Sequence, residues 1–356
     1  MERTPLRFLV VGAGGVGGVL AARLVECGYE VVTWTRSAVL REMIRTRGYE
    51  LRTGTGDRLV RGFATTDPPS GTFDFVLLTT QPKDVEEAAR RAMPFKDPDG
   101  ALVCLQNGLC EERVARIASA DDTFGAVVGW GASSPAPGVF VETARGGFTI
   151  GRVDGRRDPR LFDLASALGR VGETEITENL AGKRWSKLAL NCAISTIGTL
   201  GGDRLGTLMR HRFVRRLALD TMSEVVKVAR AEGVTLEKVA GTLDLDWISL
   251  THEERRAKLA ASLGLKHALL LAVGVRFRRL RSSMLAGLER GEAPSVDFLN
   301  GEVVTRAARH GVDVAVNERL RESVWAVSRG EATPSVALVR AIYDATGPRG
   351  SVTRAA

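Results

Sequence analysis

Apolar and polar positions along the first 35 residues predict a strand over 8–12, a helix over 19–25 and a second strand over 30–35. The first strand is short, continuously apolar and rich in valine, as expected of a strand buried on both faces of a parallel sheet. A glycine-rich segment joins it to the helix, and Gly28 can end that helix before the second strand. These residues therefore predict one complete β-α-β unit.

The alternation of strands and helices continues to about residue 151. Apolar runs predict further strands over 73–79, 101–105, 123–130 and 148–151, and a helix over 86–91. A Gly- and Thr-rich stretch at 47–62 indicates a turn or hairpin, and the Pro- and Gly-containing stretch 135–138 indicates a loop. This order is typical of a doubly wound α/β domain with a parallel sheet.

Helical periodicity dominates after about residue 178, and strand-like runs nearly vanish. The helical stretches are 181–200, 212–232, 253–288 and 298–310. The fold expected is an N-terminal Rossmann-type doubly wound α/β domain followed by an all-helical C-terminal domain. The domain boundaries predicted are 1–177, 178–347 and a tail at 348–356.

Composition and charge agree with a soluble two-domain protein. The 356 residues suffice for two domains, and 44% apolar with 26% charged residues excludes global disorder. Lys and Arg number 50 against 42 for Asp and Glu, but they form no long like-charged block. Solvated faces, or a surface that attracts small anions, are therefore favoured over nucleic-acid binding. No apolar run reaches 18 residues and no signal-peptide pattern opens the chain, so we expect a cytoplasmic protein without membrane spans.

The four cysteines (Cys27, Cys104, Cys110 and Cys192) have no CxxC spacing, and the four histidines are scattered. Neither set has the pattern of a disulfide framework or a metal site, so no metal is expected.

The glycine-rich segment between the first strand and helix has the dinucleotide-binding pattern. Gly12 permits the tight turn, Gly14 lets the backbone approach a pyrophosphate, and Gly17 permits close packing of the helix on the sheet. The position between a strand and a helix supports this interpretation over a purely structural turn. The candidate cofactor contacts here are Gly12, Ala13, Gly14, Gly15, Val16 and Gly17.

The end of the second strand bears on which dinucleotide binds. A ribose 2′-hydroxyl is usually held there by Asp or Glu, whereas this chain has Arg36 between two hydroxyl residues, Thr35 and Ser37. A cation with neighbouring hydroxyls suits a 2′-phosphate and favours NADP(H) over NAD. The alternative is a solvated loop arginine.

Three polar residues share one face of the first predicted helix of the second domain. Lys187, Asn191 and Ser195 are spaced by four residues, and the positions between them are apolar. A partly desolvated lysine can protonate a carbonyl oxygen, so the stripe is either a catalytic lining or an exposed face. Farther along, Asp297 is a candidate N-cap of a helix.

Six segments, in this order along nearly the whole chain, resemble the ketopantoate reductase (2-dehydropantoate 2-reductase) family. They are Gly12-x-Gly14-x-x-Gly17, Trp34-x-Arg36, Leu105-Gln-Asn107-Gly108, Trp185-x-Lys187-Leu-x-x-Asn191, Ser282-Ser283-Met284 and Asp297-x-x-Asn300-Gly301. Their order and spacing are much more specific than any single motif. That family has a Rossmann domain and a helical domain, and it uses NADPH to reduce a 2-oxo acid.

The resemblance implies a role for each matching polar residue. Lys187 would be the general acid at the substrate carbonyl. Asn107 would lie near the nicotinamide and the substrate, Asn191 would hold the substrate's hydroxyl, and Ser283 would contact its carboxylate. The partner implied is a small 2-oxo acid, the pathway is pantothenate biosynthesis, and a homodimer is left open.

The chain departs from the family at the substrate side. Where the family usually has a lysine after the third long strand, this chain has Thr80 and Gln81, with Lys83 close behind, and we retain Gln81 and Lys83 as candidate cofactor contacts. Ser195 replaces a second asparagine, and Ser295 stands in place of an active-site glutamate. Both remain candidate substrate contacts, and losing two polar positions should change specificity more than reaction type.

Extra helical sequence at about 247–276 also makes the chain longer than a typical member. The function expected is NADPH-dependent reduction of 2-dehydropantoate or a close analogue. The alternatives are an oxidoreductase for another keto or imino compound in a specialised pathway, a non-catalytic NADPH-binding sensor, and, on the high pI alone, a nucleic-acid-binding protein.

Overall fold

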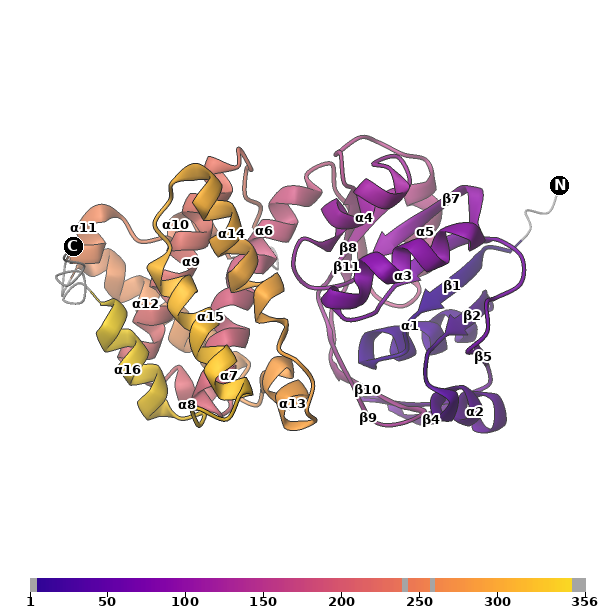
Figure 1. Ribbon diagram of the computed structural model, residues 1–356, viewed down its shortest axis with the longest axis horizontal. Coiled ribbons are helices and arrows are strands. Elements are labelled where there is room, and N and C mark those ends of the chain that lie inside the picture. The colour runs from indigo at the N-terminus through magenta and orange to yellow at the C-terminus, as the bar shows by residue number, and fades with distance from the viewer. Residues whose placement is uncertain (1–4, 239–242, 257–259, 348–356) are drawn as a thin grey trace. The chain divides into compact units, whose positions relative to one another are not determined.

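The computed structural model describes residues 5–238, 243–256 and 260–347. The chain divides into two compact units, Met1–Leu180 and Ala181–Ala356, whereas the sequence placed the junction after residue 177. Every strand among the described residues lies in the first unit, and the described part of the second unit, pink to yellow in Figure 1, is built from helices. The predicted fold class is therefore confirmed. The predicted tail, 348–356, lies outside the described residues.

The first unit is organised around an eight-stranded sheet in the order β12-β11-β8-β7-β6-β1-β2-β5. Its strands are β1 (Arg7–Val11), β2 (Glu30–Trp34), β5 (Phe63–Thr65), β6 (Phe73–Leu78), β7 (Lys96–Cys104), β8 (Thr123–Val128), β11 (Phe148–Arg152) and β12 (Thr174–Ile176). The strands from β5 to β8 pair in parallel, and β11 is antiparallel to β8. The order of the parallel strands reverses direction between β1 and β6, which is where open α/β sheets bind ligands.

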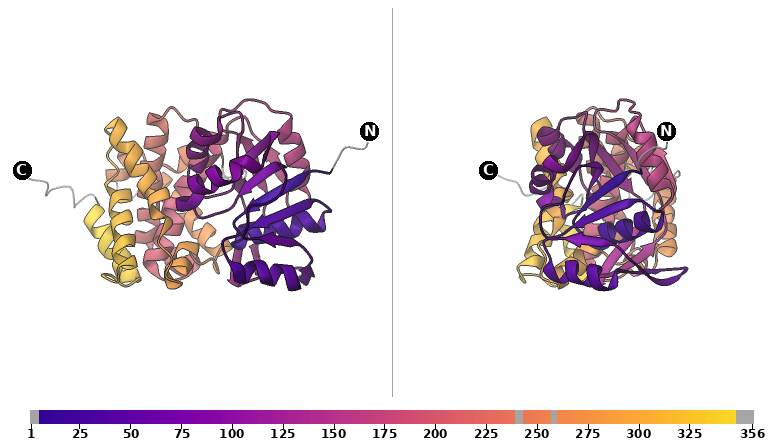
Figure 2. Two further views of the ribbon diagram at one scale, coloured as in Figure 1. Left: turned by 45° about the vertical axis from the view of Figure 1, so that its right-hand side comes forward. Right: turned by 90° about the vertical axis from the view of Figure 1, so that its right-hand side faces the viewer.

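Helices cover both faces of this sheet (Figure 2). They are α1 (Gly15–Glu26), α2 (Ala38–Arg47), α3 (Val85–Ala92), α4 (Cys110–Ala118) and α5 (Arg160–Gly169), with short 3-10 turns η1 (Pro82–Asp84) and η2 (Met93–Phe95). Successive β1 residues point to opposite faces of the sheet and belong to two separate cores. Phe8 packs with α1 and α5, while Leu9 packs with α3 and α4. The continuously apolar strands of the sequence are therefore buried on both sides.

A second, four-stranded sheet in the order β4-β3-β10-β9 packs beside α1. It consists of β3 (Tyr49–Thr53), β4 (Gly56–Val60), β9 (Gly131–Ala136) and β10 (Val139–Ala144). The hairpin expected at 47–62 is present as β3 and β4. The loop expected at 135–138 is wrong in part, because β9 runs through Ala136 and only a tight turn with Gly138 at φ +80° remains.

The helices of the second unit pack around the long, largely buried α9. They are α6 (Leu180–Leu190), the π-helical turn η3 (Asn191–Ser195), α7 (Thr196–Gly201), α8 (Leu205–Leu208), α9 (Arg212–Ala231), α10 (Leu245–Ile248), α11 (His252–Arg256), α12 (Ala261–Arg276), α13 (Ser283–Glu289), the 3-10 turn η4 (Ser295–Phe298), α14 (Asn300–His310), α15 (Ala315–Ser328) and α16 (Val336–Thr346). The helical stretch expected over 253–288 is divided among α11, α12 and α13. The extra segment 247–276 extends from α10 through α12, and its residues 257–259 lie outside the described part.

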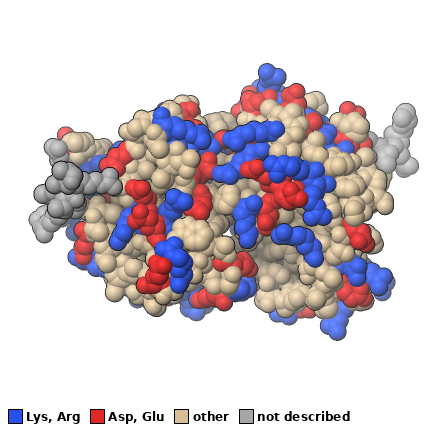
Figure 3. Space-filling model, viewed as in Figure 1, with Lys and Arg blue, Asp and Glu red and all other residues tan. Residues whose placement is uncertain are grey.

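Charge is mixed on the face drawn in Figure 3, where Lys and Arg alternate with Asp and Glu. Many of the arginines are paired with a carboxylate, as in Arg7–Glu30 and Arg340–Asp344. None of the described helices is both long and apolar enough to cross a bilayer.

Candidate functional site

The glycine-rich turn after β1 has the geometry of a phosphate-binding loop. Gly12 has φ +94°, a region that favours glycine, and a Cβ there would meet the main-chain nitrogen of Thr80 at 3.1 Å. A Cβ on Gly17 would collide with the Thr79 hydroxyl, whereas one on Gly14 would meet nothing within 4 Å. The turn is therefore closed toward β6 and open at Gly14. Together with the positive end of the α1 dipole, this leaves room for a pyrophosphate.

Four strands bring the predicted cofactor residues to one edge of the sheet. Because β7, β6, β1 and β2 are parallel neighbours, Asn107, Gln81, Gly12 and Arg36 all follow carboxyl ends at the same edge. The Gly12 N–H donates to the Trp34 carbonyl at 2.9 Å, which joins the glycine turn directly to the end of β2. Asn107, Gln81 and Lys83 are exposed.

Arg36 is also exposed and pairs with Asp84 across 3.1 Å. Ser37, the next residue, caps α2 by accepting the Leu40 N–H at 3.2 Å, so the backbone at Arg36 is fixed by the helix that follows. A guanidinium held by one half-buried carboxylate still has N–H groups to offer to a phosphate.

Thr79 and Thr80 follow β6, near the position where the family resemblance led us to expect a lysine. The Thr79 hydroxyl donates to the Gly12 carbonyl at 2.6 Å, and the Gln106 amide donates to the Thr80 hydroxyl at 3.4 Å. These residues hold the glycine turn rather than adding charge to it. Neither threonine was predicted as a site residue. The only feature of the sequence that pointed to these positions was the absence of the family's lysine.

Lys187 is the most perturbed candidate in the second unit. Its side chain is partly buried on α6, and burial, assisted by the positive charge of Arg184, lowers its pKa to about 7. A lysine normally titrates near 10.4, so the fall places its proton loss in the neutral range. That is the pKa range in which a general acid works best at neutral pH.

Asn191 is the first residue of the π-helical turn η3, which joins the end of α6 to the start of α7. The Thr196 N–H donates to the Asn191 carbonyl, so the turn carries one extra residue. Among the described residues, no acceptor lies within hydrogen-bond distance of the buried Asn191 Nδ2. A buried amide N–H without an acceptor is costly, and π-turns are frequent at functional sites. A ligand oxygen would satisfy this group.

Ser282, rather than Ser283, contacts the turn. The Ser282 hydroxyl donates to the Ser195 carbonyl at 2.8 Å, lies 2.8 Å from the Thr199 hydroxyl and caps α13. Ser283 is exposed in the first turn of α13. Sequence reasoning assigned no role to Ser282, because it placed this residue inside one continuous helix over 253–288, whereas a new helix, α13, begins directly after it.

A buried polar network supports the π-turn from behind. Asn300, fully buried at the start of α14, donates to the Cys192 carbonyl at 3.3 Å and to Asn317 at 2.9 Å, and accepts from the Thr196 hydroxyl at 2.6 Å. Asn317 donates in turn to Glu224 at 2.8 Å. Burial raises the pKa of Glu224 to about 7. The motif asparagine therefore positions the turn that carries Asn191.

The segment around Ser295 corrects one expectation. Asp297 does not cap α14. It lies in η4 and accepts from Arg321 at 2.5 Å and from the Trp325 ring nitrogen at 3.2 Å, so it ties η4 to α15. Ser295 opens η4 and is partly buried.

Neither nearby glutamate replaces the one that the sequence comparison found missing. Glu289 pairs with Arg281, and Glu292 pairs with Arg290 across 2.8 Å, all at exposed positions.

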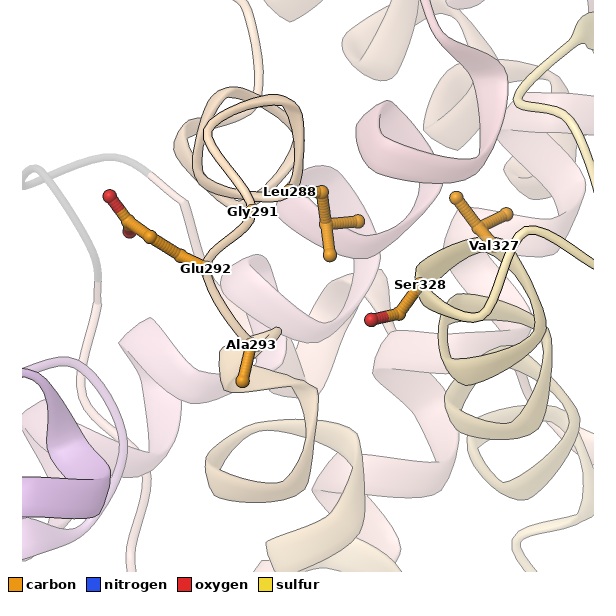
Figure 4. A pocket seen from close by; sticks show the side chains of 6 residues that line it. All are labelled: Leu288, Gly291, Glu292, Ala293, Val327 and Ser328. Atoms are coloured by element: carbon orange, nitrogen blue, oxygen red, sulfur yellow. The ribbon is translucent and has the colours of Figure 1, made fainter.

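A cavity of about 300 Å³ lies beside η4 in the second unit. It is lined by Leu288, Gly291, Glu292, Ala293, Val327 and Ser328. In Figure 4 the Glu292 carboxylate extends away from Ser328. None of the predicted site residues lines this cavity, so it does not mark the candidate site.

A doubly wound unit with a glycine-rich turn where its strand order reverses, followed by a helical unit with a partly buried lysine of lowered pKa, is the arrangement of a two-domain oxidoreductase. Residues 8–155 match the family "Ketopantoate reductase PanE/ApbA", and residues 179–327 match its C-terminal counterpart. The chain therefore belongs to the ketopantoate reductase family, and the resemblance found in the sequence is confirmed.

Individual relatives agree with the family match. The chain is 29% identical to a 2-dehydropantoate 2-reductase of Halobacterium salinarum over 91% of this chain and 99% of the relative. It is 24% identical to the protein of that name from Pyrococcus horikoshii over 92% and 97%.

Solved structures share the fold over nearly the whole chain. A ketopantoate reductase from Ralstonia eutropha superimposes with a TM-score of 0.74 and 25% identity over 95% of this chain and 98% of that one. A D-mandelate dehydrogenase solved with NADH and anilino(oxo)acetate gives a TM-score of 0.78 at 15% identity over 91% and 99%. At that identity the second likeness concerns the fold alone.

Proposed function

We propose that the protein reduces a small 2-oxo acid, 2-dehydropantoate or a close analogue, with NADPH. The observation that carries the proposal is the partly buried Lys187, with its pKa near 7, one turn before the unsatisfied amide of Asn191. The family and the curated relatives named 2-dehydropantoate 2-reductase support it. The corresponding pathway would be pantothenate biosynthesis, in the cytoplasm.

The cofactor residues proposed are those of the glycine turn and the neighbouring strand ends. Main-chain N–H groups of Gly12–Gly17 would hold the pyrophosphate, and Arg36 would bind the 2′-phosphate. Gln81, Lys83 and Asn107 stand at the same edge of the sheet and would contact the remainder of the cofactor. Bound NADPH would supply the hydride.

Lys187 is the proposed general acid. Its ammonium group would donate a proton to the carbonyl oxygen that becomes the product's hydroxyl. With a pKa near 7, about half of the molecules carry this proton at neutral pH. The partial burial that lowers the pKa also strengthens the interaction of the ammonium with a developing alkoxide.

Asn191 would donate its unsatisfied N–H to a substrate oxygen, and Ser195, Ser283 and Ser295 are the other proposed substrate contacts. Ser295 is shorter than the glutamate of related chains and is neutral. A site that has lost a charged contact favours substrates that lack the matching group. For this reason a different keto or imino substrate is the second candidate, favoured by Ser195 and Ser295.

The direct test is oxidation of NADPH by purified protein with 2-dehydropantoate, run beside NADH and a panel of 2-oxo and imino acids. A Lys187→Met variant should lower kcat by roughly 10²–10⁴, the usual contribution of a general acid. Lys183→Met is the matched control, since Lys183 lies one turn earlier on α6 and pairs with Glu237 at 3.5 Å. A fall of less than about threefold in Lys187→Met would remove Lys187 from the mechanism.

The pH dependence gives a second readout. Because reduction needs the protonated form of Lys187, kcat/KM should be level below about pH 7 and fall about tenfold per pH unit above it. The reverse oxidation needs the neutral amine and should rise with pH up to about 7. A reduction rate that stays level to pH 9 would contradict this assignment. Tight NADPH binding without turnover on any substrate would favour the sensor alternative, and steeply salt-dependent affinity for DNA would favour nucleic-acid binding.

A further inference from the structure

The positive charge of the chain is concentrated in one segment. Residues 255–288 hold eight lysines and arginines and no aspartate or glutamate. The formal net charge of the whole chain is also +8, so the remainder, with 42 residues of each sign, is neutral. Four of the eight cations stand in one exposed run at the end of α12 and directly after it, Val275-Arg-Phe-Arg-Arg-Leu-Arg281. The high pI therefore reflects a local feature rather than an evenly basic surface.

This run has a defined backbone conformation. After α12 the chain makes a tight turn, in which the Leu280 N–H donates to the Phe277 carbonyl at 2.8 Å. The Leu280 carbonyl accepts the Leu205 N–H of α8 at 2.9 Å. A Cβ on Gly206 would lie only 2.7 Å from the Cα of Arg278, so the turn also packs tightly on α8. The turn is therefore held against the body of its unit.

Five exposed arginines surround the contact between α8 and this turn. One directly precedes α8, one follows α8 by two residues, and three belong to the end of α12 and the turn. Among the described residues none of the five pairs with a carboxylate, and the nearby Glu289 is already paired with Arg281. We call the five the arginine face: Arg204, Arg210, Arg276, Arg278 and Arg279.

Exposed apolar side chains stand among these arginines. Val275, Phe277 and Leu280 are 62%, 44% and 45% exposed, and each is next to an arginine in the sequence. Apolar side chains that lie in water and are rimmed by polar residues mark an interaction site. The arginine face therefore combines a cluster of cations with apolar side chains at its centre.

This combination restricts the chemistry of the partner. Guanidinium groups bind phosphate through paired N–H groups, and both nucleic acids and anionic phospholipids offer phosphate. Binding to the phosphates of a nucleic acid would leave Val275, Phe277 and Leu280 in water. At a bilayer surface the phosphates lie directly above the acyl chains, so arginines and apolar side chains find their partners together. A membrane surface fits both parts of the face.

We propose that the arginine face binds the surface of anionic phospholipid membranes, with Val275, Phe277 and Leu280 inserted at the level of the headgroups. The attraction between charges extends over about 10 Å at 0.1 M salt, and each arginine near the surface increases binding about fivefold. The association is peripheral and reversible, because a small apolar cluster does not anchor a protein permanently. This inference does not depend on the reaction catalysed.

Flotation of the full chain with phospholipid vesicles tests the proposal. Binding to vesicles with about 30% phosphatidylglycerol should be at least about tenfold stronger than binding to phosphatidylcholine alone. Raising the salt to about 0.5 M should release most of the protein, because it shortens the range of the attraction. The triple variant Arg276→Gln, Arg278→Gln and Arg279→Gln should bind the anionic vesicles about 100-fold more weakly.

A second triple variant is the matched control. Arg145→Gln, Arg156→Gln and Arg157→Gln remove the same charge from exposed positions of the other unit, and binding should change less than about threefold. The control separates the arginine face from the net charge of the chain. Circular dichroism and thermal melts verify that each variant is folded.

The apolar contribution needs its own variant and probe. Phe277→Ser with Leu280→Ser keeps the charge and should lower binding about tenfold. Val275→Cys carrying a polarity-sensitive fluorophore should shift its emission to the blue on anionic vesicles. The same label at Phe162→Cys, a 69% exposed position on α5 of the other unit, should not shift. Cys27→Ser removes the partly exposed native thiol from both labelled proteins, and the other three cysteines are buried.

Four outcomes would overturn the proposal. The first is equal binding to anionic and neutral vesicles, or binding to neither. The second is an equal loss of binding in the two triple variants. The third is a protein that binds nucleic acid through the arginine face but leaves anionic vesicles unbound. The fourth is a label at Val275→Cys whose emission the vesicles do not change, since the apolar side chains would then stay outside the bilayer. Selective loss in the first triple variant together with the shift at Val275→Cys would support it.

Discussion

Arg36 and Asp84 form an exposed ion pair at the edge of the sheet where the cofactor's ribose is proposed to lie. An exposed pair of this kind contributes little to stability, so it can be broken or shared at low cost. A 2′-phosphate would compete with Asp84 for the Arg36 guanidinium, whereas a ribose 2′-hydroxyl could accept its hydrogen bond and leave the pair in place. The choice between NADPH and NADH therefore depends on these two residues.

Replacing Arg36 should separate the two cofactors. Arg36→Ala removes charge-assisted hydrogen bonds to the 2′-phosphate, so the Kd for NADPH should rise at least about tenfold, while that for NADH should change less than about twofold. Titration of nicotinamide fluorescence measures both constants.

Two further variants sharpen this test. Asp84→Asn should act in the opposite direction by releasing Arg36 for the phosphate. Arg45→Ala, an exposed arginine on α2 paired with Glu42, is the matched control. Equal losses of NADPH and NADH affinity in Arg36→Ala would show that Arg36 does not bind the 2′-phosphate.

Among the helices and strands, those whose structure depends on a local pattern of residues could be predicted from the sequence. The first β-α-β unit follows from its apolar strands and glycines, and the change to helices near 178 follows from periodicity. The strands β9 and β10 were not foreseen, since polar residues such as Ser133 and Ser134 give no strand pattern and pair only because β3 lies beside β10. The π-turn at Asn191 could not be read from spacing either, because it depends on Asn300, more than a hundred residues away.

The contribution of the buried network behind the π-turn to stability can be tested by replacing Asn300. Asn300→Leu keeps the volume but leaves the Cys192 carbonyl, the Thr196 hydroxyl and Asn317 without their partner, so the free energy of unfolding should fall by about 2–4 kcal/mol. Urea denaturation followed by circular dichroism measures this change.

The kinetics of Asn300→Leu provide a second test of whether this network positions the π-turn. If the network holds Asn191 in place, Asn300→Leu should also raise KM for the 2-oxo acid more than it changes the Kd for NADPH. Thr305→Ala, an exposed change on the same helix, should stay within about 0.5 kcal/mol of the wild type. An Asn300→Leu protein as stable as the control would mean that the network does not support the turn.

For the whole molecule, the main feature is the division into two units with separate cores. Phe8 and Leu9 belong to the two cores that flank the sheet of the first unit, whereas Trp185 and Leu217 are among the buried residues of the second. Every residue proposed to hold the pyrophosphate and the 2′-phosphate belongs to the first unit, and Lys187 and Asn191 belong to the second. A ligand that carries only the phosphate-bearing half of the cofactor should therefore act on one unit.

Hydrogen exchange with 2′-phospho-ADP-ribose, which lacks the nicotinamide ring, tests that division. At a ligand concentration about 100 times its Kd, binding should stabilise the unit that holds it by about 2.7 kcal/mol. The slowest-exchanging amides of the first unit should then exchange up to about 100-fold more slowly, while peptides of the second unit keep their rates, because separate cores can open independently. Equal protection of both units would mean that they open together, and protection of neither would remove the glycine turn from cofactor binding. Arg36→Ala under the same conditions should lose most of the protection, which ties the effect to the 2′-phosphate.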